Sequence, residues 1–331
     1  MKPRDTMLPR HAAGSFELKE GTGPITGMQS CGEFLEIYKV DKTFRVKSPE
    51  SIDPEETNPN AMWVTSPTDD VGTGNPIVAR AFLQNCQMLN SAIFDQEIDK
   101  DEVIMTLHSC KEALITCDKI CRKVTKSVLD ICKVIEGSGV ERDNRGRGLN
   151  PFPQVEQLDT DCGTFLVQAN RVIKMLSGLP SLLLPLSKED SNFDYLAKRI
   201  ESEAVDAPRL LEFIKDNAKG VKYLAELRNF HEHPKKIRTI INNFTLTPNS
   251  SIEIPTWHLS GEAKSPIHEE MRAATNFLLE LIEITFIHTL MASLSKSYPF
   301  IIQKEKKIDE ANPIQYRLTI DVGQFNVEQI I

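Results

Sequence analysis

Apolar residues recur every three or four positions through most of the middle of the chain. This spacing extends over residues 75–96, 99–137, 155–177, 193–203, 206–233 and 265–297. Such a period puts the apolar residues on one face of a helix, so each stretch is predicted to be helical. Asn75-Pro76 is a typical helix start, and Gly178 with Pro180 is a typical stop. We expect the first two helices to pack antiparallel.

Alternating apolar and polar residues predict strands in three other places. Phe34 to Val40 and Thr43 to Val46 flank Asp41-Lys42 and form a plausible hairpin. A second hairpin is expected over 237–257, around the turn Pro248-Asn249-Ser250-Ser251. A weak strand is expected from Tyr316 to Val322. The predicted strands are thus minor additions to a mainly helical chain.

These elements predict a mainly α fold, an antiparallel helical bundle with an inserted β-hairpin and small terminal β or irregular extensions. Residues 1–75 are rich in Pro, Gly, Ser and Thr and are expected to be an irregular or β arm. The bundle would occupy residues 76–299 and a β extension residues 300–331. No internal repeat is found.

The segment Gly137 to Pro153 interrupts the helical pattern. It has four glycines, two prolines and the arginines Arg142, Arg145 and Arg147. No apolar period runs through it, so we expect a mobile crossover. Its arginines are either solvated or in contact with a polyanion.

Composition indicates a soluble protein of a reducing cytoplasm. The 331 residues carry a net charge of −8, and the longest apolar stretch, 277–294, is interrupted by Glu280, Glu283 and His288. Neither a membrane span nor an export signal is therefore expected. Seven cysteines are an odd number, unlike a secreted disulfide scaffold. Four of these cysteines share one helical face and are expected in the core: Cys110, Cys117, Cys121 and Cys132.

One cluster, Leu227 to Pro234, combines two histidines, an arginine and an amide at a helix end. Arg228 lies about five turns after Leu210, so it should point inward along the apolar stripe. A guanidinium there needs a carboxylate, a carbonyl or a bound anion, and Glu280 and Glu283 are possible partners. His233 precedes Pro234 and should end the helix.

The run Leu-Arg-Asn-Phe-His-Glu-His resembles the signature of the HEPN superfamily, in which an arginine and a polar residue precede a histidine by a few positions. Arg228, Asn229 and His233 match that signature with four residues between the arginine and the histidine. Pro234 and the long hairpin insertion depart from it. The resemblance implies a helical bundle that dimerises, with metal-independent ribonuclease activity and frequent roles as toxins or in phage defence. A partner antitoxin or sensor is implied in the same way.

The chemistry of these residues is compatible with RNA cleavage. His233 would act as the acid or base, Arg228 would stabilise the phosphorane, and Asn229 would orient the phosphate or the imidazole. His231 or Glu232 could assist. Residues 209–238 hold eight Lys or Arg against four acids, so His231, Lys235, Lys236 and Arg238 are candidate RNA-binding residues. No metal and no cofactor are expected.

The cluster is also compatible with two roles that involve no catalysis. Cations in the last turn of a helix interact favourably with its dipole and need no ligand. Alternatively, the chain is a non-catalytic helical module that binds a nucleotide or RNA, or another protein. A homodimer is expected in the ribonuclease case.

Overall fold

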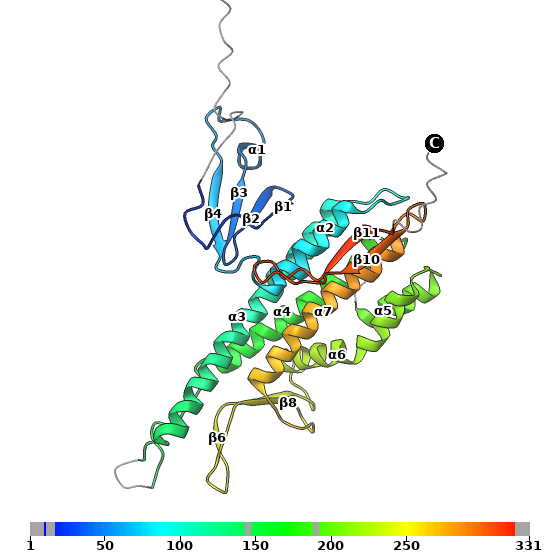
Figure 1. Cartoon of the computed structure of the whole chain (residues 1–331). Helices are drawn as coiled ribbons and strands as arrows, with labels where there is room; N and C mark the ends of the chain where they lie inside the picture. The colour runs from blue at the N-terminus through cyan, green and yellow to red at the C-terminus, as the bar shows by residue number, and fades with distance from the viewer. Residues whose placement is uncertain (1–9, 11–16, 143–146, 188–191, 322–331) are drawn as a thin grey trace, which may run out of the picture. The chain divides into compact units, whose positions relative to one another are not determined.

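A computed structural model describes residue 10 and residues 17–142, 147–187 and 192–321, and its elements are shown in Figure 1. The chain divides into two compact units. The first comprises Met1–Lys111, Leu182–Leu184 and Phe286–Ile331; the second comprises Glu112–Ser181 and Pro185–Thr285. Helices α3 (Lys100–Ser138) and α7 (Ile267–Ser293) contribute residues to both units.

A four-stranded antiparallel sheet begins the first unit. Its strands are β1 (Gly27–Cys31), β2 (Phe34–Tyr38), β3 (Thr43–Lys47) and β4 (Val64–Asp69), in the order β1-β2-β3-β4. The hairpin predicted around Asp41-Lys42 is confirmed as β2 and β3. The sheet has its own apolar cluster of Ile37, Phe44 and Val46. A short helix, α1 (Pro49–Ile52), follows β3.

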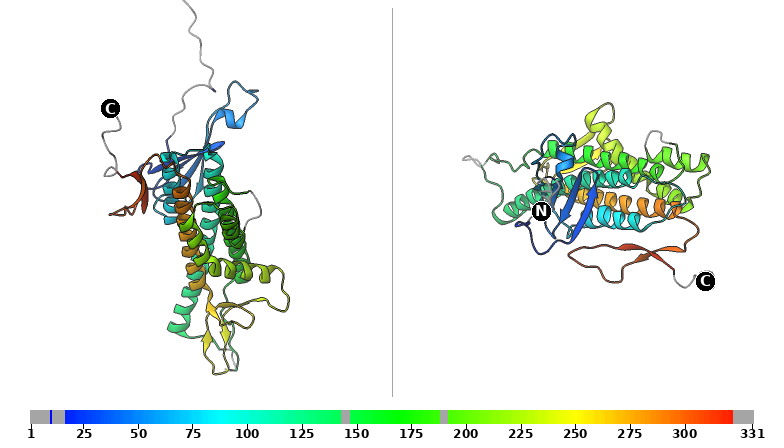
Figure 2. Two further views of the ribbon diagram at one scale, coloured as in Figure 1. Left: turned by 90° about the vertical axis from the view of Figure 1, so that its right-hand side faces the viewer. Right: turned by 90° about the horizontal axis from the view of Figure 1, so that it is seen from above.

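The helix predicted over 75–96 has a different form. It is a π-helix, η2 (Ile77–Leu83), followed by α2 (Gln84–Ser91). Buried Gln84 accepts hydrogen bonds from the backbone N–H groups of Gln315 and Tyr316. These bonds hold β11 (Tyr316–Ile320) beside α2 in the first unit, as Figure 2 shows. Strand β11 pairs with β10 (Phe300–Lys304); the expected strand residue Val322 lies outside the described residues.

Three helices form the part of the second unit that carries the site. They are α4 (Leu158–Gly178), α5 (Phe193–Ser202) and α6 (Pro208–Glu232), and both α4 and α5 pack on α6. A short 3₁₀ helix, η3 (Leu179–Leu182), follows α4. A Cβ on Gly220 of α6 would lie 3.0 Å from the ring of Phe277. The absence of a side chain at Gly220 therefore leaves space for the Phe277 ring of α7.

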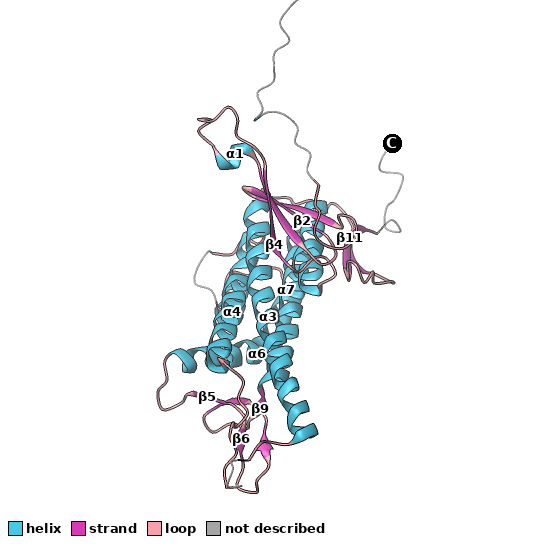
Figure 3. Cartoon of the chain, turned by 90° about the vertical axis from the view of Figure 1, so that its left-hand side faces the viewer, coloured by secondary structure: helices cyan, strands magenta, loops and turns pink. Residues whose placement is uncertain are grey.

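The inserted hairpin of the second unit is confirmed, although it is divided between two small sheets (Figure 3). One has the order β5-β8-β9, with β5 (Thr239–Asn242), β8 (Thr256–Leu259) and β9 (Ser265–Pro266). The other pairs β6 (Thr245–Leu246) with β7 (Ile252–Glu253). Trp257 of β8 is fully buried, and its ring lies 6.0 Å from that of Phe165 on α4.

The expectation of a mainly α, all-helical bundle is wrong. The structure is 49% helical and 17% strand, its described residues form four separate small sheets, and it is a mixed α/β protein. Strand β9 escapes detection by periodicity because it is only two residues long. Strand β1 contains Gly27 and β4 contains Pro67, two residue types that are depleted in strands.

Helix α7 is the one described helix long and apolar enough to cross a membrane, and 67% of its most apolar window is buried. That burial is typical of a core helix in a soluble protein. The expected core cysteines Cys110, Cys117 and Cys121 are buried, while Cys132 is partly exposed. Burial raises the pKa of the Cys117 thiol to about 12.

Candidate functional site

A pocket of about 370 Å³ opens between α4, α5 and α6 within the second unit. Its size falls within the range of small-ligand sites, about 300–1,000 Å³. Two of the predicted site residues, Arg228 and Asn229, contribute to its wall. The remaining lining residues are Asn170, Ile173, Lys174, Asn192, Phe193, Asp194, Ala218, Val221, Lys222 and Ala225.

Arg228 is held at the pocket wall by neighbours on its own helix. One terminal nitrogen, Nη2, forms an ion pair with Glu232, and the other, Nη1, donates to Asn229 Oδ1 at 3.0 Å. The third nitrogen, Nε, is buried and has no hydrogen-bond partner among the described residues. The side chain is 25% exposed, so it is less buried than expected, and its partner is Glu232 rather than Glu280 or Glu283.

Two lysines add positive charge to the same wall. Lys174 on α4 is exposed and forms no ion pair with a described residue, while Lys222 on α6 lies 3.9 Å from Glu226. Asp194 is the carboxylate among the lining residues. Among the lining residues alone, there are therefore three cationic side chains and one carboxylate.

The N-terminus of α5 also faces the pocket. Asn192 is the N-cap and accepts a hydrogen bond from the backbone N–H of Tyr195, and Phe193 and Asp194 are the first helical residues. Backbone N–H groups in a first helical turn carry partial positive charge and favour anions. Phe193, Ile173 and Val221 are buried and give the pocket an apolar component.

His231 is a packing residue between α6 and α4. A Cβ on Gly163 of α4 would lie 2.8 Å from His231 Cε1, so the imidazole occupies the space that Gly163 leaves free. Its Nε2 lies 3.5 Å from Asp159 Oδ1. His231 does not line the pocket.

His233 does not join Arg228 in the pocket. It is the exposed C-cap of α6, with non-helical backbone angles, and its N–H donates to the carbonyl of Asn229. Five helical residues correspond to a rotation of about 140°, so Arg228 and His233 project in different directions. Lys235, Lys236 and Arg238 are exposed in the following segment and are not lining residues.

Sequence reasoning missed Asn170, Lys174 and Asn192. Lys174 and Asn170 lie four residues apart on α4 and so share a face, but that spacing is equally typical of an ordinary solvated surface. Their relation to Arg228 depends on how three helices pack. No local pattern in the sequence encodes that packing.

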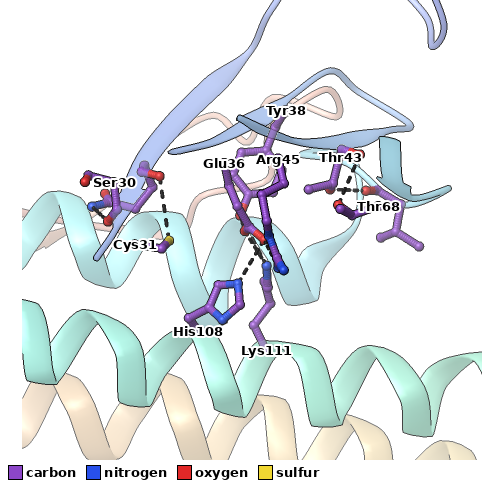
Figure 4. A network of polar contacts seen from close by, with 11 residues as sticks. Ser30, Cys31, Glu36, Tyr38, Thr43, Arg45, Thr68, His108 and Lys111 are labelled. Atoms are coloured by element: carbon purple, nitrogen blue, oxygen red, sulfur yellow. Dashed lines mark hydrogen bonds and ion pairs between the residues drawn. The ribbon is translucent and has the colours of Figure 1, made fainter. Parts of the chain in front are cut away.

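A second polar cluster lies in the first unit, where buried Glu36 of β2 accepts several hydrogen bonds (Figure 4). Lys111 Nζ lies 2.6 Å and His108 Nε2 2.9 Å from its carboxylate, Arg45 Nη2 lies 3.2 Å away, and Tyr38 OH also donates to it. Burial alone would raise the pKa of Glu36, but the hydrogen bond to His108 and the charge on Lys111 outweigh it, so the pKa falls well below its usual range. Burial, and then the Glu36 charge, raise the pKa of Tyr38.

This cluster also contains a possible set of metal ligands. Atoms of Cys31, Glu36 and His108 lie within 4.8 Å of one another, and all three residues are buried. Lys111 and Arg45 already neutralise the Glu36 carboxylate, and a dication beside them would be repelled. A structural zinc site also has four protein ligands rather than three. We therefore treat the cluster as a structural ion-pair network.

Comparison of this chain with protein-family models, curated proteins and solved structures finds no match. The HEPN resemblance consequently depends on the short motif alone, and any functional assignment depends on the geometry of the pocket.

Proposed function

We propose that this protein binds the phosphate groups of RNA or of a nucleotide in the Arg228 pocket, without cleaving its ligand. The observation that carries the proposal is the position of the Arg228 guanidinium in a ligand-sized pocket together with Lys174, Lys222 and the N-terminus of α5. Arginine presents a planar set of donors that suits phosphate oxygens. This proposal corresponds to the alternative, left open by the sequence, of a non-catalytic module that binds a nucleotide or RNA.

The free donor of Arg228 supports this ligand class. Burying an N–H group without an acceptor costs about 1–3 kcal/mol. Among the described residues, Nε of Arg228 has no acceptor. A phosphate oxygen placed beside Nε would satisfy it. The apolar residues Phe193, Ile173 and Val221 would then lie near the sugar or base.

The proposal is tested by fluorescence anisotropy with a labelled mixed-sequence RNA oligonucleotide at low salt. Arg228→Ala is expected to weaken binding by about ten- to a hundredfold, the effect of losing about 1.5–3 kcal/mol from hydrogen bonds to a charged group. The matched control is Arg209→Ala, an exposed arginine on the same helix outside the pocket. Equal affinities of the wild type and both variants would refute the proposal.

RNA cleavage of the HEPN type is a second proposal, favoured by the exposure of His233 at the end of α6. One copy of the chain does not bring His233 to Arg228, so this activity requires a homodimer in which a second copy supplies the imidazole. His231, Lys235, Lys236 and Arg238 would then contact RNA. The cytoplasmic setting, the defence role and the antitoxin or sensor partner belong to this proposal.

The second proposal has its own test. Wild type and His233→Ala are incubated with RNA in the presence of a chelator, and the products are examined for 2′,3′-cyclic phosphate ends. Cleavage by the wild type alone would support the ribonuclease and contradict the non-catalytic proposal. Unchanged RNA in both samples would contradict the ribonuclease proposal and leave phosphate binding as the proposed function.

A further inference from the structure

We infer that the Arg228 pocket selects a singly charged phosphodiester over a doubly charged terminal phosphate, and that Glu232 sets this preference. The inference rests on the proposed phosphate-binding function. It narrows the ligand class to the internal backbone of a nucleic-acid strand, as opposed to a free mononucleotide.

Glu232 and a bound phosphate would compete for one guanidinium. Glu232 pairs with Nη2 of Arg228, while the adjacent Nε is buried and unpartnered among the described residues. The Nε and Nη2 groups form one edge of the guanidinium, the edge that binds two oxygens of a carboxylate or phosphate side by side. A phosphate that takes this edge must displace Glu232 or share the edge with it. The Glu232 carboxylate therefore stays close to the bound ligand.

The charges around the pocket are nearly balanced. The lining cations are Lys174, Lys222 and Arg228. Lys222 is paired with Glu226 and Arg228 with Glu232, and Asp194 is itself a lining residue. The three cations thus face three carboxylates. A site whose formal charges cancel suits an anion of low charge.

A terminal phosphate carries about −1.5 to −2 charges at pH 7, whereas a phosphodiester carries one. Repulsion from a neighbouring carboxylate grows in proportion to the charge of the ligand. The Glu232 side chain is 28% exposed, so solvent screens part of its charge. Its presence therefore disfavours the terminal phosphate more than the phosphodiester.

The test compares dimethyl phosphate with methyl phosphate, probes that differ by one methyl group and one charge. Binding of each to the full chain is followed near neutral pH by NMR titration of the Arg228 Nε–H and the pocket amides. We expect the wild type to bind dimethyl phosphate at least as tightly as methyl phosphate. Glu232→Gln should tighten methyl phosphate about two- to fivefold more than it tightens dimethyl phosphate, as expected for one partly screened charge pair.

The matched control is Glu212→Gln, which removes an exposed carboxylate on the far side of α6 and should change neither affinity. Lowering the pH below about 6 removes the second charge of methyl phosphate, so the wild-type discrimination should shrink there. Equal effects of Glu232→Gln on the two probes would overturn the inference and leave phosphate binding intact. No shift of the pocket signals with either probe, in the wild type or Glu232→Gln, would instead refute the proposed function.

Discussion

Glu36 and Arg228 are charged side chains whose surroundings give them different roles. Glu36 is 1% exposed and accepts hydrogen bonds from Tyr38, Arg45, His108 and Lys111, so its oxygens have no capacity left for a ligand. Arg228 is 25% exposed, lines a pocket and keeps one donor without a partner among the described residues. A saturated buried group stabilises a fold, whereas an unsaturated group at a pocket wall is available for binding.

Replacement of Glu36 by Gln should destabilise the protein by about 3–5 kcal/mol, because buried Lys111 would lose its ion pair with the Glu36 carboxylate. The measurement is urea unfolding of the wild type and Glu36→Gln. The double variant Glu36→Gln/Lys111→Met serves as the control, and it should recover part of the loss because both charges are then absent. If Glu36→Gln unfolds at the wild-type urea concentration, the network is not structural.

The same carboxylate predicts a dependence of stability on acid. Its pKa in the folded protein lies below the unfolded value of about 4.3, so its contribution is complete above that value and is lost as the pH falls toward the folded pKa. The free energy of unfolding of the wild type should therefore fall more steeply below about pH 4.3 than that of Glu36→Gln. If the free energies of unfolding of the two proteins fall equally from neutral pH down through this range, Glu36 is not the source of the acid dependence.

At the scale of single elements, two glycines make room for side-chain rings where α6 packs against α4 and α7. Gly163 provides the space for His231, and Gly220 provides space beside Phe277. These contacts hold the helices that form the pocket. The sequence identified His231 as a candidate RNA ligand because its position at a helix end was visible, but the glycine that receives its ring lies 68 residues earlier. The contact between Gly163 and His231 is visible only in the packed structure.

Gly163→Ala should displace the His231 ring and destabilise the protein by about 1–3 kcal/mol relative to Gly178→Ala. Gly178 ends the same helix, and a Cβ there would meet nothing within 4 Å. Both changes gain the higher helix propensity of alanine, so their difference isolates the overlap with His231. Thermal or urea unfolding provides the measurement. Equal stabilities would show that the imidazole moves without cost.

Sequence patterns located the long elements more reliably than the short ones. Helix α6 was expected over 206–233 and spans Pro208–Glu232, because Pro208 starts it and Pro234 prevents its continuation. The stretch 75–96 was expected to be one regular helix, yet it begins as a π-helix and ends at Ser91. Apolar spacing alone does not distinguish a π-turn from an α-turn.

At the scale of the whole molecule, the predicted single bundle is replaced by a mixed α/β chain with two compact units. The helical regions have the amphipathic period that makes prediction possible. Strands β1, β4 and β10 show little alternation of their own, and irregular segments separate β4 and β10 from the strands they pair with. The candidate site was predicted in part, since Arg228 and Asn229 line the pocket whereas His233 does not.

Phosphate binding at Arg228 is tested most directly by NMR chemical-shift mapping of the ¹⁵N-labelled chain during titration with a short single-stranded RNA. We predict that the signals of Asn170, Phe193 and the Arg228 Nε–H shift first and together, and that Arg228→Ala abolishes these shifts. Shifts confined to His233 and the residues that follow it, or no shifts at all, would contradict phosphate binding in the Arg228 pocket.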